Sequence, residues 1–133
     1  EDEGTIDAPI GRHPIERKKM SINHKNGKEA VTHYKVIKRF KNYTYIQCQL
    51  ETGRTHQIRV HMKHLGCPIL GDSIYNGNKS KLFPNATLML HSYKLKILLP
   101  EESQIKTFRT KTPKRFIEVQ KKLKKLYPKV ILP

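Results

Sequence analysis

The sequence predicts an α+β fold in which a mostly antiparallel or mixed sheet is combined with two main helices. Two strand-like runs, 30–40 and 43–50, are separated by only two residues, as in a β-hairpin. One helical pattern follows Gly53 and a second follows Pro113. The length of 133 residues suits one domain or a large piece of one, with enough apolar residues for a modest core.

The first 29 residues are polar and interrupted by prolines and glycines. This composition predicts a long irregular segment with one short strand at 5–7. The segment also holds a dense run of basic residues, among them Lys18, Lys19 and Lys25. Such a run is either a solvated loop or a surface that contacts a polyanion, and the sequence leaves both open.

The hairpin is predicted from alternation. In residues 43–50 one face would carry Thr44, Ile46, Cys48 and Leu50, and the other face tyrosines and glutamines. Residues 30–40 form the partner strand. The hairpin therefore leads directly into the first helix.

That helix is predicted to be about three turns long. Gly53 permits a tight turn, Thr55 can cap the helix, and Gly66 can end it. Its apolar side would carry Ile58, Met62 and Leu65, and a neighbouring side His56, Arg59 and Lys63. A guanidinium placed just past the first turn can hold an anion, either a phosphate or a carboxylate from another part of the protein.

The C-terminal third is predicted to contain strands at 88–98 and 105–110, after an exposed loop at 76–81. A second helix follows, with Thr112 as its N-cap and Pro113 as its first residue. Phe116, Val119, Leu123 and Leu126 recur at helical spacing, and lysines cover the other sides. An amphipathic helix with a solvated basic face is favoured over a dedicated contact with a polyanion.

Charge is the clearest feature of the composition. Twenty-seven Lys and Arg against eleven acidic residues give +16, far more than solubility requires. Such an excess suits a polyanionic partner, because binding releases counterions, although a merely basic surface is the alternative. No apolar run approaches about 18 residues, so a membrane is not expected as a partner. Cys48 and Cys67 lack Cys-x-x-Cys spacing, which suits reduced thiols and a cytoplasmic location.

Other site chemistries are poorly supported. His61 and His64 are spaced like two metal ligands, with His56 one turn away. No cysteine or carboxylate cluster accompanies them, and the surrounding positive charge would repel a cation, so no metal site is expected. No glycine-rich phosphate loop precedes a helix, so no nucleotide cofactor is expected.

A family resemblance rests on one long ungapped run. Residues 52–61 read Thr-Gly-Arg-Thr-His-Gln-Ile-Arg-Val-His, and 68–72 read Pro-Ile-Leu-Gly-Asp. With Arg12-His13-Pro14 upstream and Leu90-His91-Ser92 downstream, this resembles the RluA/RluD-like RNA pseudouridine synthase family over most of 4–100. The resemblance implies an enzyme that isomerises uridine in RNA without a cofactor.

The resemblance also implies roles for individual residues. Arg59 matches the family's partner of the catalytic aspartate and is the candidate catalytic residue, with a purely structural ion pair as the alternative. Arg54, His56 and Gln57 would brace the turn or contact RNA. Leu90 and His91 match a second family motif, with Leu90 beneath the uracil. Asp72 is expected to close a turn rather than act as an acid or base.

The family's His-Arg-Leu-Asp motif is not in this sequence, whose aspartates are Asp2, Asp7 and Asp72. Its active-site tyrosine would lie before residue 1. Residues 1–133 are therefore expected to be the C-terminal part of a catalytic domain and to be inactive alone. Ribosomal RNA is the favoured substrate, transfer RNA is a further option, and the oligomeric state is open. The alternative is a non-catalytic basic RNA-binding module of the same fold.

The charge generates a first prediction. The chain should bind RNA with little sequence preference, and the affinity should fall steeply with salt, with a slope of log K against log salt of about −4 or steeper. Fluorescence anisotropy with a labelled RNA across a salt series measures this. Charge reversal at Lys18, Lys19 and Lys25 should reduce the slope more than reversal at Lys124 and Lys125. An affinity that hardly responds to salt would show that the basic surface is not the contact.

Overall fold

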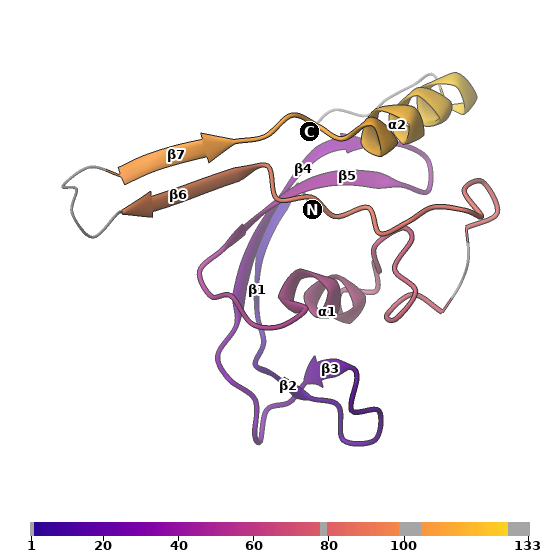
Figure 1. Cartoon of the computed structure of the whole chain (residues 1–133). Coiled ribbons are helices and arrows are strands. Elements are labelled where there is room, and N and C mark those ends of the chain that lie inside the picture. The colour runs from indigo at the N-terminus through magenta and orange to yellow at the C-terminus, as the bar shows by residue number, and fades with distance from the viewer. Residues whose placement is uncertain (1, 78–79, 99–104, 128–133) are drawn as a thin grey trace.

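The computed structural model of the chain describes residues 2–77, 80–98 and 105–127. It confirms the predicted α+β class, with antiparallel sheets and two helices (Figure 1). The central sheet has the order β1-β4-β5, formed by Glu3–Asp7, Val31–Arg39 and Thr44–Leu50. The helix α1, Gln57–His64, follows β5 directly and packs against this sheet.

The predicted hairpin is present as β4 and β5. The two strands pair antiparallel from Thr32↔Leu50 to Arg39↔Thr44, with an irregularity between Val36 and Lys38. The amide of Phe40 donates to the carbonyl of Tyr43 (2.7 Å) and closes the turn. The face predicted from alternation packs at its centre, where Ile46 and Cys48 contact the apolar cluster under α1, whereas Thr44 and Leu50 are exposed.

The prediction of an irregular segment at 1–29 is wrong in part. β1 is longer than the strand expected at 5–7, and two short strands, β2 (Ile10–Arg12) and β3 (Met20–Ile22), form an antiparallel hairpin. Apolar side chains in an otherwise polar segment explain the hairpin. Ile10 is buried, and Met20 and Ile22 pack against the cluster around it. These long-range contacts outweigh the local turn-forming composition.

Two small clusters of buried side chains lie on the α1 side of the sheet. One contains Ile10, Ala30, Val60 and Tyr75, and the other contains Ile6, Ala8 and Met62. Val60 and Met62 belong to different clusters, so α1 is in contact with both. The position of α1 is therefore fixed by packing on the β1-β4-β5 sheet and on the β2–β3 hairpin.

The C-terminal end of α1 is as predicted, but its N-cap and its length are not. Gly66 ends the helix as predicted, with φ +79, but the helix has eight residues, about two turns. Thr55 is not the cap. His56 takes the N-cap position in the left-handed conformation (φ 55), and no side chain caps the helix. Because β-branched residues avoid this conformation, a threonine is poorly suited to that position.

A chain of hydrogen bonds ties α1 to the sheet through a buried histidine. Nε2 of His61 faces the Ala8 carbonyl (2.9 Å), which can only accept, so Nε2 carries the proton. Nδ1 then accepts from the Thr32 hydroxyl (2.7 Å), which itself accepts from the Gln57 amide (3.0 Å). Burial lowers the pKa of His61, and the bond to Ala8 offsets part of that effect. His61 is therefore a neutral core residue.

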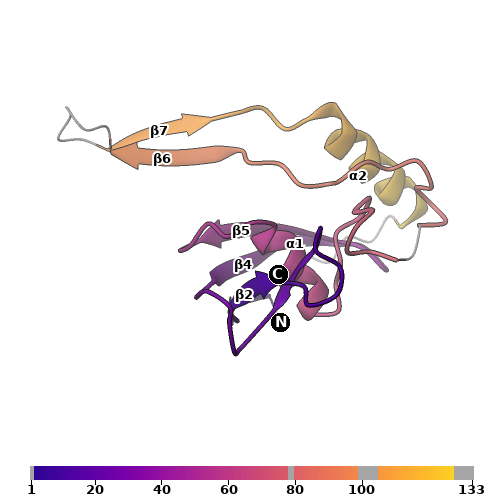
Figure 2. The same ribbon diagram turned by 60° about the horizontal axis from the view of Figure 1, so that its bottom comes forward.

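The C-terminal part forms a separate layer on the β5 side of the sheet (Figure 2). It contains the hairpin of β6 (Lys94–Leu98) with β7 (Ile105–Arg109), and the helix α2 (Lys114–Leu126). The strand predicted at 88–98 is wrong over 88–93. There the backbone bonds to other parts of the chain, since Met89 N donates to Leu70 O and Arg115 Nη2 donates to Leu90 O. Of the loop predicted at 76–81, residues 78–79 lie outside the described residues.

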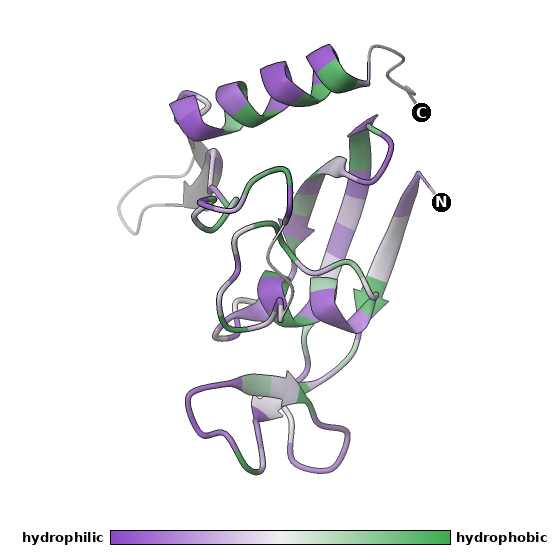
Figure 3. Cartoon of the chain, turned by 90° about the vertical axis from the view of Figure 1, so that its right-hand side faces the viewer, coloured by the Kyte–Doolittle hydropathy of each residue, from purple (hydrophilic) through white to green (hydrophobic). Residues whose placement is uncertain are grey.

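The second helix is amphipathic, as predicted (Figure 3). Leu123 is buried, and Phe116 makes an edge contact with Tyr45 of β5. The cap prediction is wrong by one residue, because Pro113 is the N-cap and Thr112 lies outside the helix. The lysines Lys121, Lys124 and Lys125 are exposed. In the described part of the chain, neither helix has the length and apolar character needed to cross a membrane.

Two glycines with the same backbone conformation give a matched test of packing. Gly71 and Gly66 both have φ near +80°, but a Cβ on Gly71 would lie 2.0 Å from the Thr87 carbonyl oxygen, whereas a Cβ on Gly66 would meet nothing within 4 Å. Gly66→Ala should therefore cost about 1–2 kcal/mol from backbone strain alone. Gly71→Ala should cost more than about 3 kcal/mol. Chemical denaturation measures both, and equal losses would contradict the close approach of residues 86–87 to Gly71.

The neutral state of His61 predicts a pH dependence. A histidine whose pKa is lowered by folding binds fewer protons in the folded state, so stability is complete above the unfolded pKa of about 6.5 and falls below it. Between pH 7.5 and 5 the wild-type chain should lose up to about 1.4 kcal/mol per pH unit below 6.5 from this group. His61→Gln, which can keep both hydrogen bonds, should show a flatter dependence in denaturation experiments.

The control is His24→Gln, which alters an exposed histidine. It should keep the wild-type slope. Equal slopes for His61→Gln and the wild type would show that His61 does not remain neutral on folding.

Candidate functional site

The predicted anion-holding residue, Arg59, forms an ion pair inside the chain. It lies in the first turn of α1, and its guanidinium donates through Nε to Oδ2 of Asp72 (2.9 Å) and through Nη2 to Oδ1 (2.8 Å). The side chain of Asp72 is fully buried, and that of Arg59 is 14% exposed. Two parallel charge-assisted bonds fix both the position and the plane of the guanidinium.

Asp72 is held by its own turn, independently of Arg59. Its Oδ1 accepts from the backbone amides of Ile74 and Tyr75, both at 3.0 Å. This confirms the predicted turn-closing role. Burial alone would raise the pKa of Asp72, but the bonds from Arg59 and from the two amides outweigh it, and the pKa lies below its usual value. The bond to Asp72 also raises the pKa of Arg59.

Tyr75 joins three segments at this site. The Arg59 guanidinium lies over its ring, 5.1 Å from the centroid. Its hydroxyl accepts from the amide of Met20 in β3 (2.9 Å) and also hydrogen-bonds to Nδ1 of His56 (2.6 Å). Burial lowers the pKa of His56, and the positive charge of Arg59 lowers it further. Both effects favour a neutral imidazole beside the guanidinium.

Gln57 and Arg54 are engaged in bracing the turn before α1. Gln57 is 3% exposed; its oxygen accepts from the Thr52 hydroxyl and the Arg54 amide, and its nitrogen donates to Val31 O and Thr32 Oγ1. Arg54 Nε donates to the Glu29 carbonyl (2.7 Å). Of the two roles that the sequence left open for these residues, this geometry favours bracing.

The basic candidates Lys18, Lys19 and Lys25 lie around the β2–β3 hairpin. Lys18 and Lys25 are exposed, whereas Lys19 pairs with Glu16 at 2.8 Å. The bond from Met20 to Tyr75 anchors the strand that follows Lys19 to the Arg59 site. The structure thus connects this basic hairpin to the ion pair through one side chain.

Leu90 and His91 are placed differently from each other. Leu90 follows the backbone bond from Met89 to Leu70, which lies in the loop that holds Asp72. His91 instead turns to the C-terminal layer, with Nε2 2.7 Å from the Thr110 hydroxyl and its ring against Phe116. Leu90 is therefore connected to the Asp72 loop, whereas the contacts of His91 are with residues around the start of α2.

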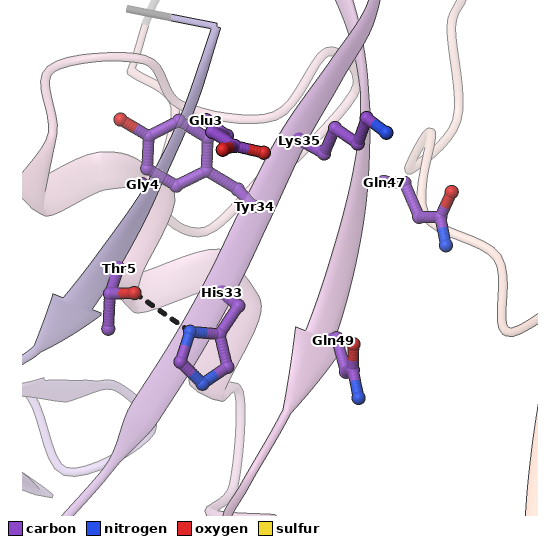
Figure 4. Close-up of a pocket in the computed structure, with 8 residues that line it drawn as sticks. All are labelled: Glu3, Gly4, Thr5, His33, Tyr34, Lys35, Gln47 and Gln49. Atoms are coloured by element: carbon purple, nitrogen blue, oxygen red, sulfur yellow. Dashed lines mark hydrogen bonds between the residues drawn. The ribbon is translucent and has the colours of Figure 1, made fainter.

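A shallow hollow of about 500 Å³ lies on the other face of the central sheet (Figure 4). Glu3, Thr5, His33, Lys35 and two glutamines of β5 line it, and Thr5 bonds to His33 at 2.8 Å. These side chains alternate with those that pack under α1. The hollow is therefore separate from the Arg59 site. Within the described ranges, no three His, Cys, Asp or Glu side chains gather as metal ligands.

Two members of the site were missed by sequence reasoning. The partnership of Asp72 with Arg59 and the role of Tyr75 were not predicted. A signal was present, because Asp72 and Tyr75 are three residues apart, the spacing of an aspartate that accepts from a backbone amide at i+3. Nothing in the local sequence indicated that this turn lies against α1.

Comparison with known proteins gives consistent matches. The family model for RNA pseudouridylate synthase matches residues 1–64. The chain is 44% identical over 124 residues to an uncharacterised RNA pseudouridine synthase of Bacillus subtilis, covering 93% of this chain and 40% of that protein. It is 58% identical over 74 residues to ribosomal large subunit pseudouridine synthase D of Pseudomonas aeruginosa, covering 56% and 23%.

The fold is similar to that of a solved structure, human RNA pseudouridylate synthase domain containing 1. The TM-score is 0.71 at 29% identity, and the match covers 85% of this chain and 49% of that one. The chain thus spans less than half the length of each of these relatives. The sequence motif, the fold and these matches agree in their similarity to the RluA/RluD-like RNA pseudouridine synthases.

Proposed function

We propose that this chain is the C-terminal part of the catalytic domain of an enzyme that isomerises uridine to pseudouridine in structured RNA. The reaction breaks the N1–C1′ bond, turns the base, and joins C5 to C1′, so it needs no cofactor. A catalytic aspartate would come from a segment of the protein outside residues 1–133. Arg59 is the residue of this chain that would act with it.

The observation that supports this role is the geometry of Arg59. Its guanidinium is held rigidly by Asp72 and Tyr75, yet the side chain retains 14% exposure. An aspartate that reacts among RNA phosphates must remain ionised, and an adjacent guanidinium favours the ionised carboxylate. A fixed guanidinium also orients that carboxylate relative to the uridine. Correct orientation of a catalytic group can lower the reaction barrier more than the change in its ionisation does.

RNA binding would use the basic hairpin near this site. Lys18, in the loop between β2 and β3, and Lys25, just after β3, are exposed, and Met20 links the hairpin to Tyr75. Phosphate contacts there would set the register of the RNA relative to Arg59. His56, which lies against Tyr75, is the candidate for contact with the extruded nucleotide.

Large-subunit ribosomal RNA is the proposed substrate, because several relatives are named for it. A cytoplasmic location follows from that substrate. Transfer RNA is the alternative substrate if the protein does not modify ribosomal RNA.

A direct test compares this chain with the whole protein. Each is incubated with ribosomal RNA and transfer RNA, and pseudouridine is mapped chemically. The whole protein should modify specific uridines, and residues 1–133 alone should give none, because they supply the arginine without the aspartate. RNA binding without modification by the whole protein would instead support a non-catalytic binding module.

A substitution tests the role of Arg59 in the whole protein. Arg59→Lys keeps the charge but loses the planar two-pronged geometry that a carboxylate accepts, so turnover should fall about 100-fold or more. RNA affinity should change less than about threefold, since lysine contacts phosphate nearly as well. Single-turnover kinetics and a binding assay separate the two effects.

The matched control is Arg39→Lys, at an arginine that pairs with Asp2 on the surface (3.1 Å). It should leave both quantities unchanged. Unchanged turnover in Arg59→Lys, together with weaker RNA binding in Arg59→Ala, would show that Arg59 grips phosphate instead.

A further inference from the structure

The guanidinium of Arg59 has distinct edges, and they are used unequally. Asp72 occupies the side edge, made of Nε and one N–H of Nη2. The Tyr75 ring covers one face. No other group in 2–77, 80–98 or 105–127 hydrogen-bonds to Arg59, which leaves the end edge, made of Nη1 and the second N–H of Nη2, available. The two N–H groups of that edge are spaced to donate to two oxygens of a second carboxylate or of a phosphate.

The position of Asp72 does not depend on its bond to Arg59. Two backbone amides hold its carboxylate in place, and the residue before it, Gly71, takes a left-handed conformation beneath residues 86–87. The carboxylate would therefore remain in this position whether or not Arg59 had a further partner. Because the Asp72 carboxylate fixes the side edge of the planar Arg59 guanidinium, it also fixes the direction in which the end edge points.

We propose that Asp72 is a positioning residue, which clamps the side edge of Arg59 so that its end edge is presented to a second anion. Tyr75 supports the clamp from the face of the guanidinium and connects it to Met20 and to His56. This inference rests on the proposed function for the identity of the second anion, the carboxylate of the catalytic aspartate. The clamp itself does not depend on that identity.

Asp72→Asn is the informative variant. An asparagine keeps an oxygen for the amides of Ile74 and Tyr75, so the turn should persist. Its amide nitrogen takes the place of Oδ2, is a donor and cannot accept from Nε of Arg59, so the two-pronged clamp should be reduced to at most the single bond from Nη2 to Oδ1. Glu118→Gln, which removes one exposed carboxylate on α2, is the matched control for charge.

The first measurement uses this chain. Hydrogen exchange of the Arg59 Nε–H, followed by nitrogen-15 NMR, should be slow in the wild type and in Glu118→Gln. In Asp72→Asn it should be about tenfold faster or more. If that variant does not fold, Asp72→Glu, which keeps the charge but moves the carboxylate by one methylene, should give an intermediate rate. An exchange rate that stays at the wild-type value in the folded variant would overturn the clamp.

The second measurement uses the whole protein and a double-mutant cycle. Asp72→Asn should lower turnover about 30-fold in the wild-type background but less than about threefold in Arg59→Lys, because it acts through Arg59. RNA affinity should be unchanged. An equal loss in both backgrounds would assign Asp72 to stability and overturn its positioning role. If the wild-type protein makes no pseudouridine, the proposed function fails, and the exchange measurement alone decides the clamp.

Discussion

The bond between Arg59 and Asp72 connects the elements on which the site depends. Arg59 belongs to α1 and Asp72 to the loop that follows it, so the pair closes the chain around residues 59–72. Taking two charges out of water is costly, and a buried pair contributes little unless its geometry and remaining hydrogen bonds are good. Here the carboxylate accepts four bonds, two from Arg59 and two from backbone amides. The pair is thus well satisfied, and removing either partner would leave a charge without its counterion.

Tyr75 extends this constraint to the surface that we propose for RNA. Its ring lies in the apolar cluster with Ile10 and Val60, and its hydroxyl reaches both Met20 and His56. The β2–β3 hairpin is too short to be stable alone. It is held by Ile10 and Met20 on the core, and so the basic residues between its strands are positioned relative to Arg59 by packing. The surface proposed for RNA and the ion pair of Arg59 with Asp72 are therefore supported by the same side chain, Tyr75.

Patterns that depend on neighbours along the chain were predictable. Alternation identified β4, β5 and the buried face with Ile46, and helical spacing identified α2. Structure set by distant contacts was not. The β2–β3 hairpin was missed because its stability comes from Ile10 and Met20 on a remote core, while the prolines nearby indicate a loop. The strand expected over 88–93 failed because that backbone bonds to Leu70 and Arg115 rather than to a strand.

The site shows the same division. The motif around Arg59 indicated an anion-holding residue, but whether the anion came from RNA or from the protein depended on where the loop with Asp72 folds. The N-terminus of α1 is a further example of structure set by a distant contact. Thr55 is the better capping residue by type, yet His56 takes the N-cap position, because Gln57 is anchored to β4 through Val31 and Thr32.

A crystal structure of the whole protein bound to its RNA would test the central claim most directly. We predict that the carboxylate of an aspartate from outside residues 1–133 lies about 3 Å from Nη1 of Arg59, while Asp72 keeps Nε and Nη2. A structure in which Nη1 contacts only an RNA phosphate, or in which the arginine leaves Asp72 to reach another group, would contradict it.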